Sequence, residues 1–284
     1  MQWQARRERF RAILTGNKCV HPASVFDPLS ARIAEHLGYE FAMMAGSTAS
    51  LTVLGAPDLV LLTASEFVQQ AQRVCRAMTL PLLVDADHGY GNALNVARTV
   101  EELATVGVAA ATIEDTNLPP TFGSKGKAVL IPVEEGVGKM RSALAARPDS
   151  GFAVIGRTSA PSISNIDDTV KRLTAYEKAG VDALFIVGLK TIADLKAIGA
   201  ATTLPLILGN VSGELAGADL AAHRVRISLQ GHAPIMAAVQ AVYDTMKALR
   251  EGTKPGELKG VASSALMATL TRAAAYDEAT KKYL

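Results

Sequence analysis

Two aspartates follow a short apolar run: Leu80-Pro81-Leu82-Leu83-Val84 leads into Asp85-Ala86-Asp87, and the turn His88-Gly89-Tyr90-Gly91 comes next. Apolar runs of this length, bounded by proline and glycine, are typical of strands buried on both faces. Side chains at positions i and i+2 of a strand point to the same face, so the two carboxylates converge. Like charges there repel unless a proton or a cation lies between them, and Mg²⁺ is the natural hard cation for oxygen ligands. The alternative interpretation is that Asp87 caps the next helix and Asp85 is solvated.

The elements that must position these acids alternate along the chain. Short apolar runs, each followed by a segment with helix signals, recur eight times, and no hairpin signal joins neighbouring runs. Eight parallel strand–helix units in 284 residues predict an α/β fold, a (β/α)8 barrel of the TIM type. A doubly wound open sheet is the alternative, but neither of its glycine-rich nucleotide-binding motifs is present. The predicted strands cover residues 19–25, 41–45, 80–84, 108–113, 152–155, 183–187, 204–208 and 224–228.

Additional helices are predicted at both ends of the chain. An N-terminal helix covers 6–14, and a turn-rich linker from residue 252 leads to one helix at 263–276. We therefore expect residues 1–284 to form a single barrel domain, with 252–284 as a helical oligomerisation tail. The tail helix carries more apolar residues than a free helix should expose.

Composition excludes several classes of partner. The chain is 49% hydrophobic and 20% charged with a net charge of +2, so nucleic acid and anionic membranes are poor candidates. No apolar stretch reaches the roughly 18 residues of a membrane span, and the charged residues 1–11 lack a signal region. Two cysteines, Cys19 and Cys75, suit a reducing compartment. We expect a cytoplasmic protein.

Polar residues gather after the predicted strands, where a (β/α)8 barrel has its active site. The acids follow neighbouring strands two to four, while Arg157 and His232 follow strands five and eight across the mouth. A metal held by carboxylates beside a guanidinium is suited to binding a small dianion or keto acid. The candidate residues are Ser47, Asp58, Asp85, Asp87, Glu114, Arg157, Asn210 and His232.

Ser47, the loop with Asp58, the motif D-x-D-x-G-Y-G at 85–91, Glu114-Asp115 and Arg157 together resemble the phosphoenolpyruvate mutase/isocitrate lyase superfamily. The resemblance spans about residues 10–250. It implies that Asp87 binds Mg²⁺ directly, or Mn²⁺ as a substitute, and that water ligands of the metal are held by Asp58, Asp85 and Glu114. It also implies an α-keto-acid substrate bound by Ser47 and Arg157, and we expect His232 and Asn210 to contact the substrate as well.

The loop at 116–131 indicates which branch of the superfamily this chain resembles most. Lyase members carry Lys-Lys-Cys-Gly-His there, whereas this chain reads Phe-Gly-Ser-Lys-Gly-Lys at 122–127, without Cys or His. The Lys- and Asn-bearing loop of mutase and phosphonopyruvate hydrolase members is not matched either. The oxaloacetate decarboxylase branch is most similar, through Glu114-Asp115-Thr116, the segment 133–139, Gly209-Asn210 and Gly231-His232-Ala233. That branch carries a Tyr where this chain has Leu208, so we expect a hydroxyl to be missing from the site.

This branch implies a Mg²⁺-dependent carboxy-lyase that converts oxaloacetate, or a close 2-keto dicarboxylate, to pyruvate and CO₂ through an enolate. Ser47, Arg157 and His232 would be its catalytic residues, although His232 could instead be a packed histidine bonded to a carbonyl. Two alternatives remain open: a carbon–carbon lyase of the 2-methylisocitrate type, and a catalytically impaired keto-acid-binding protein, for which Leu208 is the main argument. Resembling proteins form tetramers with exchanged C-terminal helices, so a homotetramer is expected.

Overall fold

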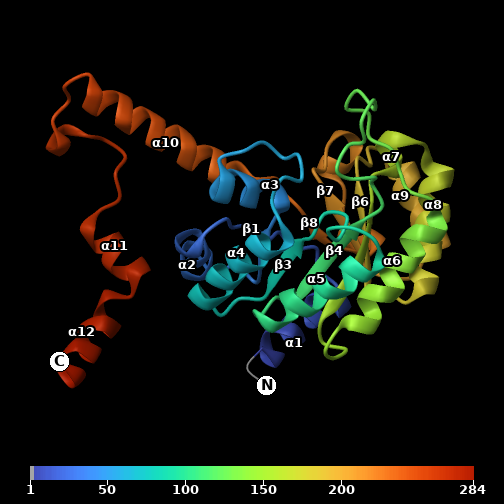
Figure 1. The fold of residues 1–284 in the computed structure, drawn as a ribbon, viewed down its shortest axis with the longest axis horizontal. Coiled ribbons are helices and arrows are strands. Elements are labelled where there is room, and N and C mark those ends of the chain that lie inside the picture. The colour runs from blue at the N-terminus through green and yellow to red at the C-terminus, as the bar shows by residue number, and fades with distance from the viewer. Residues whose placement is uncertain (1–2) are drawn as a thin grey trace.

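A computed structural model describes residues 3–284, and its core is an eight-stranded parallel sheet in chain order (Figure 1). The last strand returns to the first: the Val20 N–H donates to the Arg226 carbonyl (2.9 Å), and the Val20 carbonyl accepts from Ser228 N–H (3.0 Å). The predicted (β/α)8 barrel is therefore confirmed. The strands are β1 (Ala23–Ser24), β2 (Ala42–Met44), β3 (Leu82–Asp85), β4 (Ala110–Glu114), β5 (Ala153–Thr158), β6 (Ala183–Val187), β7 (Leu206–Gly209) and β8 (Val225–Ser228).

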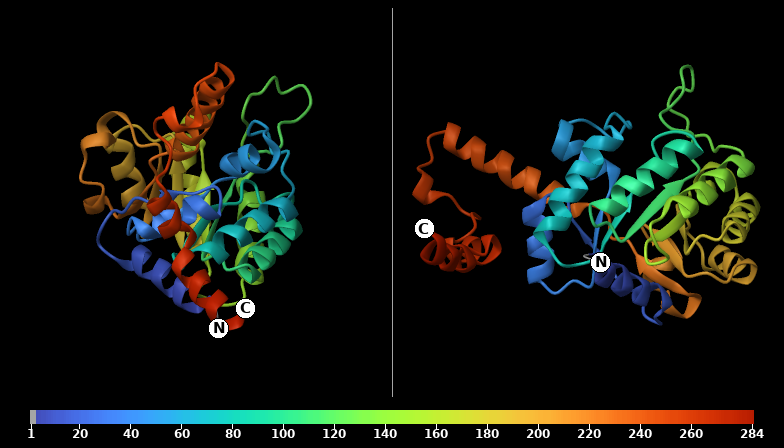
Figure 2. Two further views of the ribbon diagram at one scale, coloured as in Figure 1. Left: turned by 90° about the vertical axis from the view of Figure 1, so that its left-hand side faces the viewer. Right: turned by 60° about the horizontal axis from the view of Figure 1, so that its bottom comes forward.

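Helices cover the outside of the sheet, as the alternation predicted (Figure 2). Many begin where a short polar side chain accepts a hydrogen bond from the first turn; Asp27, placed before Pro28, accepts from Ser30 N–H. Between β7 and β8 the expected short helix is replaced by two 3₁₀ turns, η2 (Gly213–Gly217) and η3 (Ala221–His223). The main covering helices are α2 (Pro28–His36), α4 (Ala64–Ala77), α5 (Ala93–Thr105), α6 (Val133–Ala146), α8 (Ile166–Ala179) and α9 (Ile192–Ala201).

Two short elements that the sequence patterns did not predict lie next to the mouth. A single turn, α3 (Gly46–Ala49), continues into a π-helix, η1 (Ser50–Leu54), directly after β2. Another turn, α7 (Ala160–Ile163), follows β5. The loop at 116–131 is irregular as expected, with one antiparallel bridge between Thr116 and Leu130.

The N-terminal helix α1 (Gln4–Thr15) closes the end of the barrel opposite the strand C-termini. Phe10 packs edge-to-face on Phe41, with ring centroids 5.7 Å apart, and joins the apolar cluster inside the barrel. Arg6 and Arg7 donate to carbonyl oxygens at the ends of outer helices, among them Met78 (2.6 Å) and Ala104 (2.8 Å). Because α1 covers this end of the barrel, a substrate could enter only at the other end, where the strands have their C-termini.

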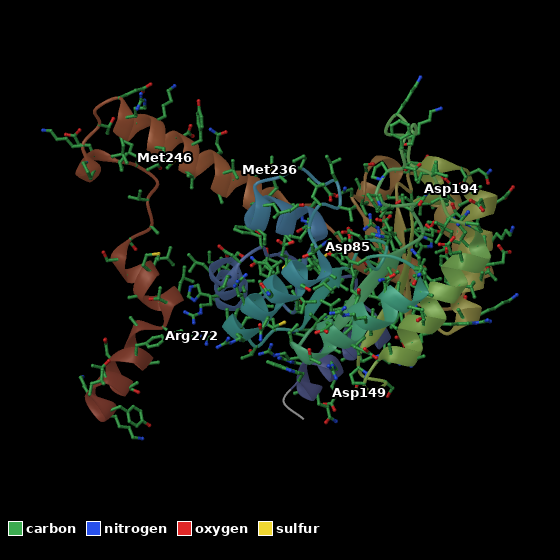
Figure 3. The ribbon with its side chains drawn as sticks, viewed as in Figure 1. Asp85, Asp149, Asp194, Met236, Met246 and Arg272 are labelled. Atoms are coloured by element: carbon green, nitrogen blue, oxygen red, sulfur yellow. The ribbon has the colours of Figure 1, made fainter. Side chains whose placement is uncertain are left out.

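The C-terminal region leaves the barrel. Helix α10 (Ala233–Arg250) projects outward, and Ile235 is its only buried residue (Figures 1 and 3). The prediction of a single tail helix at 263–276 is wrong. The structure has two helices there, α11 (Ser264–Thr271) and α12 (Ala273–Tyr283), and a 3₁₀ turn, η4 (Pro255–Glu257), precedes them. Arg272 breaks the helix in a left-handed conformation (φ 60°).

Arg272 also fastens this tail to the barrel. Its guanidinium donates to Glu35 Oε2 of α2 (2.7 Å) and to the Ala77 carbonyl at the end of α4 (3.0 Å), and α11 packs on α2. These long-range bonds favour a break at Arg272 over continuation of the helix, and local helix signals cannot report them. Among residues 3–284 no helix is both long and apolar enough to cross a membrane.

Candidate active site

Asp85 and Asp87 lie at the C-terminal end of β3, as predicted, but only Asp85 belongs to the strand, so the alternation of side chains along a strand does not place Asp87. Asp85 is the last residue of the strand, and its Oδ1 accepts from Thr112 Oγ1 of β4 (2.8 Å). Asp87 lies in a left-handed turn (φ 49°), a conformation rarely adopted by residues other than glycine. The turn is held by Glu114, whose N–H donates to the Asp87 carbonyl (2.8 Å), and by Lys139, whose ammonium donates to the His88 carbonyl (3.0 Å). Strain of this kind is characteristic of functional sites.

The Asp87 carboxylate has the environment of a metal ligand. Within residues 3–284 no group donates a hydrogen bond to it, and it lies against the Cα of Gly46. Burial, and then the charges of Asp85, Glu114 and Asp58, raise its pKa well above the usual range. The charge repulsion that the spacing implied is therefore present, and a divalent cation would relieve it.

The oxygen donors at the mouth are of the type that Mg²⁺ uses. In the described part of the chain, no three His, Cys, Asp or Glu side chains are placed to bind one ion together. Magnesium commonly keeps several water ligands and takes only one or two carboxylates from the protein. The carboxylate cluster is compatible with that kind of coordination.

Glu114 and Arg157 connect the acids across β4 and β5. Glu114, at the end of β4, accepts from Thr116 Oγ1 (2.5 Å), and burial raises its pKa even though Arg157 opposes the rise. The Arg157 guanidinium pairs with Asp85 and lies 3.7 Å from Glu114 Oε1, with its central carbon 5.4 Å from the centroid of the Phe185 ring. Arg157 is therefore bonded to the acid cluster rather than isolated across the mouth. Its Nε is buried and has no hydrogen-bond partner among residues 3–284.

Asp58 and His232 reach the same mouth from opposite ends of the chain. Burial and the charge of Asp85 raise the pKa of Asp58, while Arg157 and His232 oppose this. Burial lowers the pKa of His232, against the attraction of Asp85 and Asp58. His232 is bonded through Nδ1 to the Ser24 hydroxyl (2.9 Å). The alternative prediction, a packed histidine bonded to a carbonyl, therefore named the wrong partner, because the bonded group is a hydroxyl.

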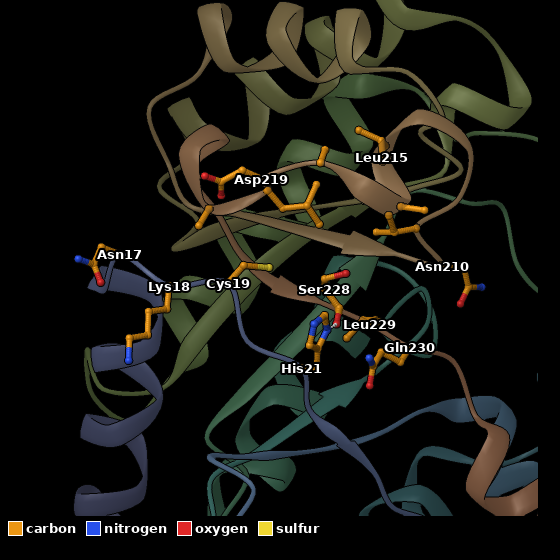
Figure 4. A pocket seen from close by; sticks show the side chains of 15 residues that line it. Asn17, Lys18, Cys19, His21, Asn210, Leu215, Asp219, Ser228, Leu229 and Gln230 are labelled. Carbon is orange, nitrogen blue, oxygen red and sulfur yellow. Dashed lines mark hydrogen bonds between the residues drawn. The ribbon is translucent and has the colours of Figure 1, made fainter.

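Ser47 lies beside the cluster, and Asn210 lies apart from it. Ser47 is partly exposed and follows Gly46, whose Cα faces the Asp87 carboxylate. Asn210 is exposed and lines a groove of about 880 Å³ together with His21 and Ser228 (Figure 4). Within residues 3–284 no hydrogen bond or ion pair joins Asn210 to the acids.

The side chain of Leu208 does not face the mouth of the barrel, where a residue of the active site would lie. Residues alternate along β7: Ile207 belongs to the cluster inside the barrel, whereas Leu206 and Leu208 belong to the layer between sheet and helices. A tyrosine at 208 would point away from the mouth. The expectation that Leu208 removes a hydroxyl from the site is therefore wrong, and the argument for an impaired protein loses its basis.

Several supporting residues were missed by the sequence patterns. Tyr176 and Arg172 of α8 both donate to Asp115 Oδ2, at 2.6 Å and 3.1 Å. Lys139 is buried although, among residues 3–284, it forms no ion pair with a carboxylate within 4.0 Å. Its segment, 133–139, carries part of the family resemblance but no local signal for a buried lysine. Ser24 had no local signal, because its partner is 208 positions away.

Comparisons with known proteins agree with this geometry. The sequence model of the family described as phosphoenolpyruvate phosphomutase matches residues 10–250. A protein from Rhodopseudomonas palustris (strain BisB18) named oxaloacetate decarboxylase is 57% identical, covering 96% of this chain and 95% of its own. Another of that name, from Bradyrhizobium diazoefficiens (strain JCM 10833 / BCRC 13528 / IAM 13628 / NBRC 14792 / USDA 110), is 56% identical over the same shares of the two chains.

Solved structures agree as well. An oxaloacetate acetylhydrolase in complex with 3,3-difluorooxalacetate is 27% identical, with a TM-score of 0.86 over 98% of this chain and 97% of that one. A phosphonopyruvate hydrolase in complex with oxalate and Mg²⁺ is 28% identical, with a TM-score of 0.85 over 98% and 99%. The resemblance drawn from D-x-D-x-G-Y-G and Glu-Asp is thereby confirmed: this chain belongs to the phosphoenolpyruvate phosphomutase family, within the phosphoenolpyruvate mutase/isocitrate lyase superfamily.

Proposed function

We propose that this protein is a Mg²⁺-dependent carboxy-lyase that converts oxaloacetate, or a close 2-keto dicarboxylate, to pyruvate and CO₂ through an enolate. The observation that carries the proposal is identity above one half, over nearly the whole chain, with relatives named oxaloacetate decarboxylase. The loop at 116–131 has no cysteine or histidine. Decarboxylation of a 3-carboxy-2-keto acid needs neither a nucleophile nor a strong base, so the reaction is compatible with that loop.

The carboxylate cluster would hold the metal. Asp87 is the proposed direct ligand, because no group within residues 3–284 donates a hydrogen bond to its carboxylate. Asp58, Asp85 and Glu114 are the proposed partners of its water ligands, and Mn²⁺ is the expected substitute. A phosphonopyruvate hydrolase of similar fold has been solved with oxalate and Mg²⁺, which supports a metal beside a small dicarboxylate.

The reaction would proceed with the side chains at the mouth in fixed roles. Bound Mg²⁺ would supply Lewis-acid stabilisation of the charge that develops on the C2 oxygen. Arg157, whose side chain is partly exposed beside its pair with Asp85, would bind the retained carboxylate, and Ser47 would donate a hydrogen bond to the substrate. The C3–C4 bond then breaks, and its electron pair remains in the enolate of pyruvate.

His232 would act at the other end of the substrate. It would orient the departing carboxylate or deliver a proton to C3 of the enolate, which completes pyruvate. Its position at the start of α10, within the field of Asp85 and Asp58, supports this role. Asn210 is a further proposed substrate contact, although its side chain is exposed and lines the groove here.

We also propose a homotetramer with exchanged C-terminal helices. In a (β/α)8 barrel the helix after β8 normally covers the outside of the barrel. Here α10 projects outward, and a groove of about 880 Å³ lies beside β8, where that helix would pack (Figure 4). Helix α10 of a second copy would fill the groove with its apolar face. The cytoplasmic location remains a prediction.

One incubation series tests the activity. The protein is mixed with Mg²⁺ and, in separate reactions, oxaloacetate, 2-methylisocitrate, isocitrate and phosphonopyruvate, and pyruvate, glyoxylate and CO₂ are measured. Pyruvate and CO₂ from oxaloacetate are expected. Glyoxylate release would instead identify a carbon–carbon lyase, and oxalate binding without any product would identify a keto-acid-binding protein.

A pair of variants tests the role of the metal ligand in the same assay. Asp87→Asn keeps the size of the side chain and removes its charge, so turnover and Mg²⁺ binding should both be lost. Asp167→Asn, on the exposed face of α8, is the matched control and should behave like the parent protein. Retained Mg²⁺ binding by Asp87→Asn would contradict the proposed ligand.

A further inference from the structure

A serine at the end of the first strand contacts the histidine at the end of the last. Ser24 Oγ lies 2.9 Å from His232 Nδ1, although the two residues are 208 positions apart in the chain. Ser24 is the second residue of β1 and pairs in register with Met43, which belongs to the cluster inside the barrel. Ala23 belongs to the outer layer, so the Ser24 side chain faces inward at the level of the mouth.

The Ser24 hydroxyl has no other hydrogen-bond partner among residues 3–284. Its backbone is held by the strand: the N–H of the next residue, Val25, donates to the Met43 carbonyl (2.9 Å). With the backbone held, the serine Oγ can move only by rotation about χ1, among three staggered positions. The hydroxyl therefore engages one ring nitrogen of His232 and leaves the other, Nε2, without a hydrogen-bond partner among residues 3–284.

The charges at the mouth decide which nitrogen carries the hydrogen. Asp85 and Asp58 are the charged groups that act on the His232 ring. A negative potential on that side favours a hydrogen on Nε2, directed toward the acids. A serine hydroxyl can donate as well as accept, so it can complement this tautomer by donating to Nδ1.

We propose that Ser24 is a positioning residue that donates to His232 Nδ1 and so holds Nε2–H toward the substrate. The inference deepens the proposed function and rests on the role given there to His232. Without the hydroxyl, the ring can rotate and both tautomers become populated, so fewer molecules present an N–H to the departing carboxylate. Binding of the retained carboxylate at Arg157 would not change.

A double-mutant cycle measures this coupling. Ser24→Ala should lower kcat for oxaloacetate about tenfold, the usual size of one well-placed hydrogen bond, and leave KM nearly unchanged. In a His232→Gln background the same change should have almost no further effect, because Ser24 acts only through the ring. Ser24→Thr, which keeps a hydroxyl and suits a strand, should recover most of the loss.

A purely structural contribution of Ser24 predicts a different result. It would lower kcat by the same factor in both backgrounds, and that result would overturn the proposal. Full activity of Ser24→Ala in the parent background would do so too. Thermal unfolding of each variant shows whether it is folded.

A second readout does not require turnover. In protein labelled with ¹⁵N-histidine, the His232 signals are identified by their loss in His232→Gln. The parent should show the Nε2–H tautomer, and Ser24→Ala a mixture of tautomers. An unchanged spectrum would refute the positioning role. If the parent protein fails to decarboxylate oxaloacetate but the spectra differ as expected, then the proposed function is wrong and the positioning role stands.

Discussion

The Cα of Gly46 faces the carboxylate of Asp87 at a distance that only glycine permits. A β-carbon at position 46 would lie 2.6 Å from Oδ2 and 2.8 Å from Oδ1 of Asp87. Gly46 has a helical backbone that alanine could adopt, so the requirement comes from this contact and not from the conformation. The first turn after β2 thus fixes where the proposed metal ligand can stand.

Gly46→Ala should therefore displace the Asp87 carboxylate and weaken Mg²⁺ binding. We expect a loss of roughly tenfold or more in affinity, similar to other changes beside a metal ligand. Isothermal titration with Mg²⁺ measures it directly. The matched control is Gly138→Ala in α6, where an added β-carbon meets nothing within 4 Å. The control should bind Mg²⁺ normally and gain about 0.4–1 kcal/mol in the free energy of unfolding; equal losses in both variants would refute the steric argument.

Lys139→Met tests the buried ammonium behind the Asp87 turn. Removing a positive charge near Glu114 and Asp115 would by itself strengthen the binding of a cation. We expect the opposite, a weaker Mn²⁺ signal in electron paramagnetic resonance titrations, because the hydrogen bond to the His88 carbonyl holds the turn. Lys171→Met on the exposed face of α8 serves as the control. Tighter Mn²⁺ binding by Lys139→Met would show that charge outweighs positioning.

Val242→Glu tests the outward helix α10. An apolar face that includes Met236, Val239, Val242 and Met246 is exposed along this helix, and Figure 3 shows Met236 and Met246 on it, away from Asp85. Exposed apolar surface of this extent is typical of an interface, so a buried charge should dissociate the assembly. Light scattering after size-exclusion chromatography should show smaller species. Ala241→Glu, an exposed position about 160° around the helix from Val239, should leave the mass unchanged; a parent protein that is monomeric would refute the tetramer.

Asp149→Asn tests the plug formed by α1 through its pH dependence. Burial acts to raise the pKa of Asp149, but the N–H groups of Gly151 and Phe152 and the Arg7 guanidinium prevail and lower it. A carboxyl with a lowered pKa in the folded state contributes stability above its unfolded pKa of about 3.9 and loses that contribution as the pH falls through its folded value. The variant should therefore unfold at a lower temperature than the parent at pH 7. The difference should shrink below about pH 4; a constant difference from pH 7 to 2.5 would contradict this.

Local patterns in the sequence determined the barrel and the position of its acids. Strand and helix signals depend on near neighbours, so the eight-fold alternation and the loop at 116–131 could be predicted. The spacing of Asp85 and Asp87 at the end of a strand, with Glu114 at the end of the next, places the carboxylates at one end of the barrel because parallel strands share a direction. The metal roles of these acids are still predictions.

Only the tertiary structure decided which side chains meet. The bond from Ser24 to His232, the pair of Arg157 with Asp85, and the contact of Lys139 with the His88 carbonyl join residues that are 208, 72 and 51 positions apart. Helix α10 is equally amphipathic whether it covers its own barrel or another, so its local sequence cannot choose its direction. Such choices depend on packing and charge between distant elements, which the folded chain alone brings together.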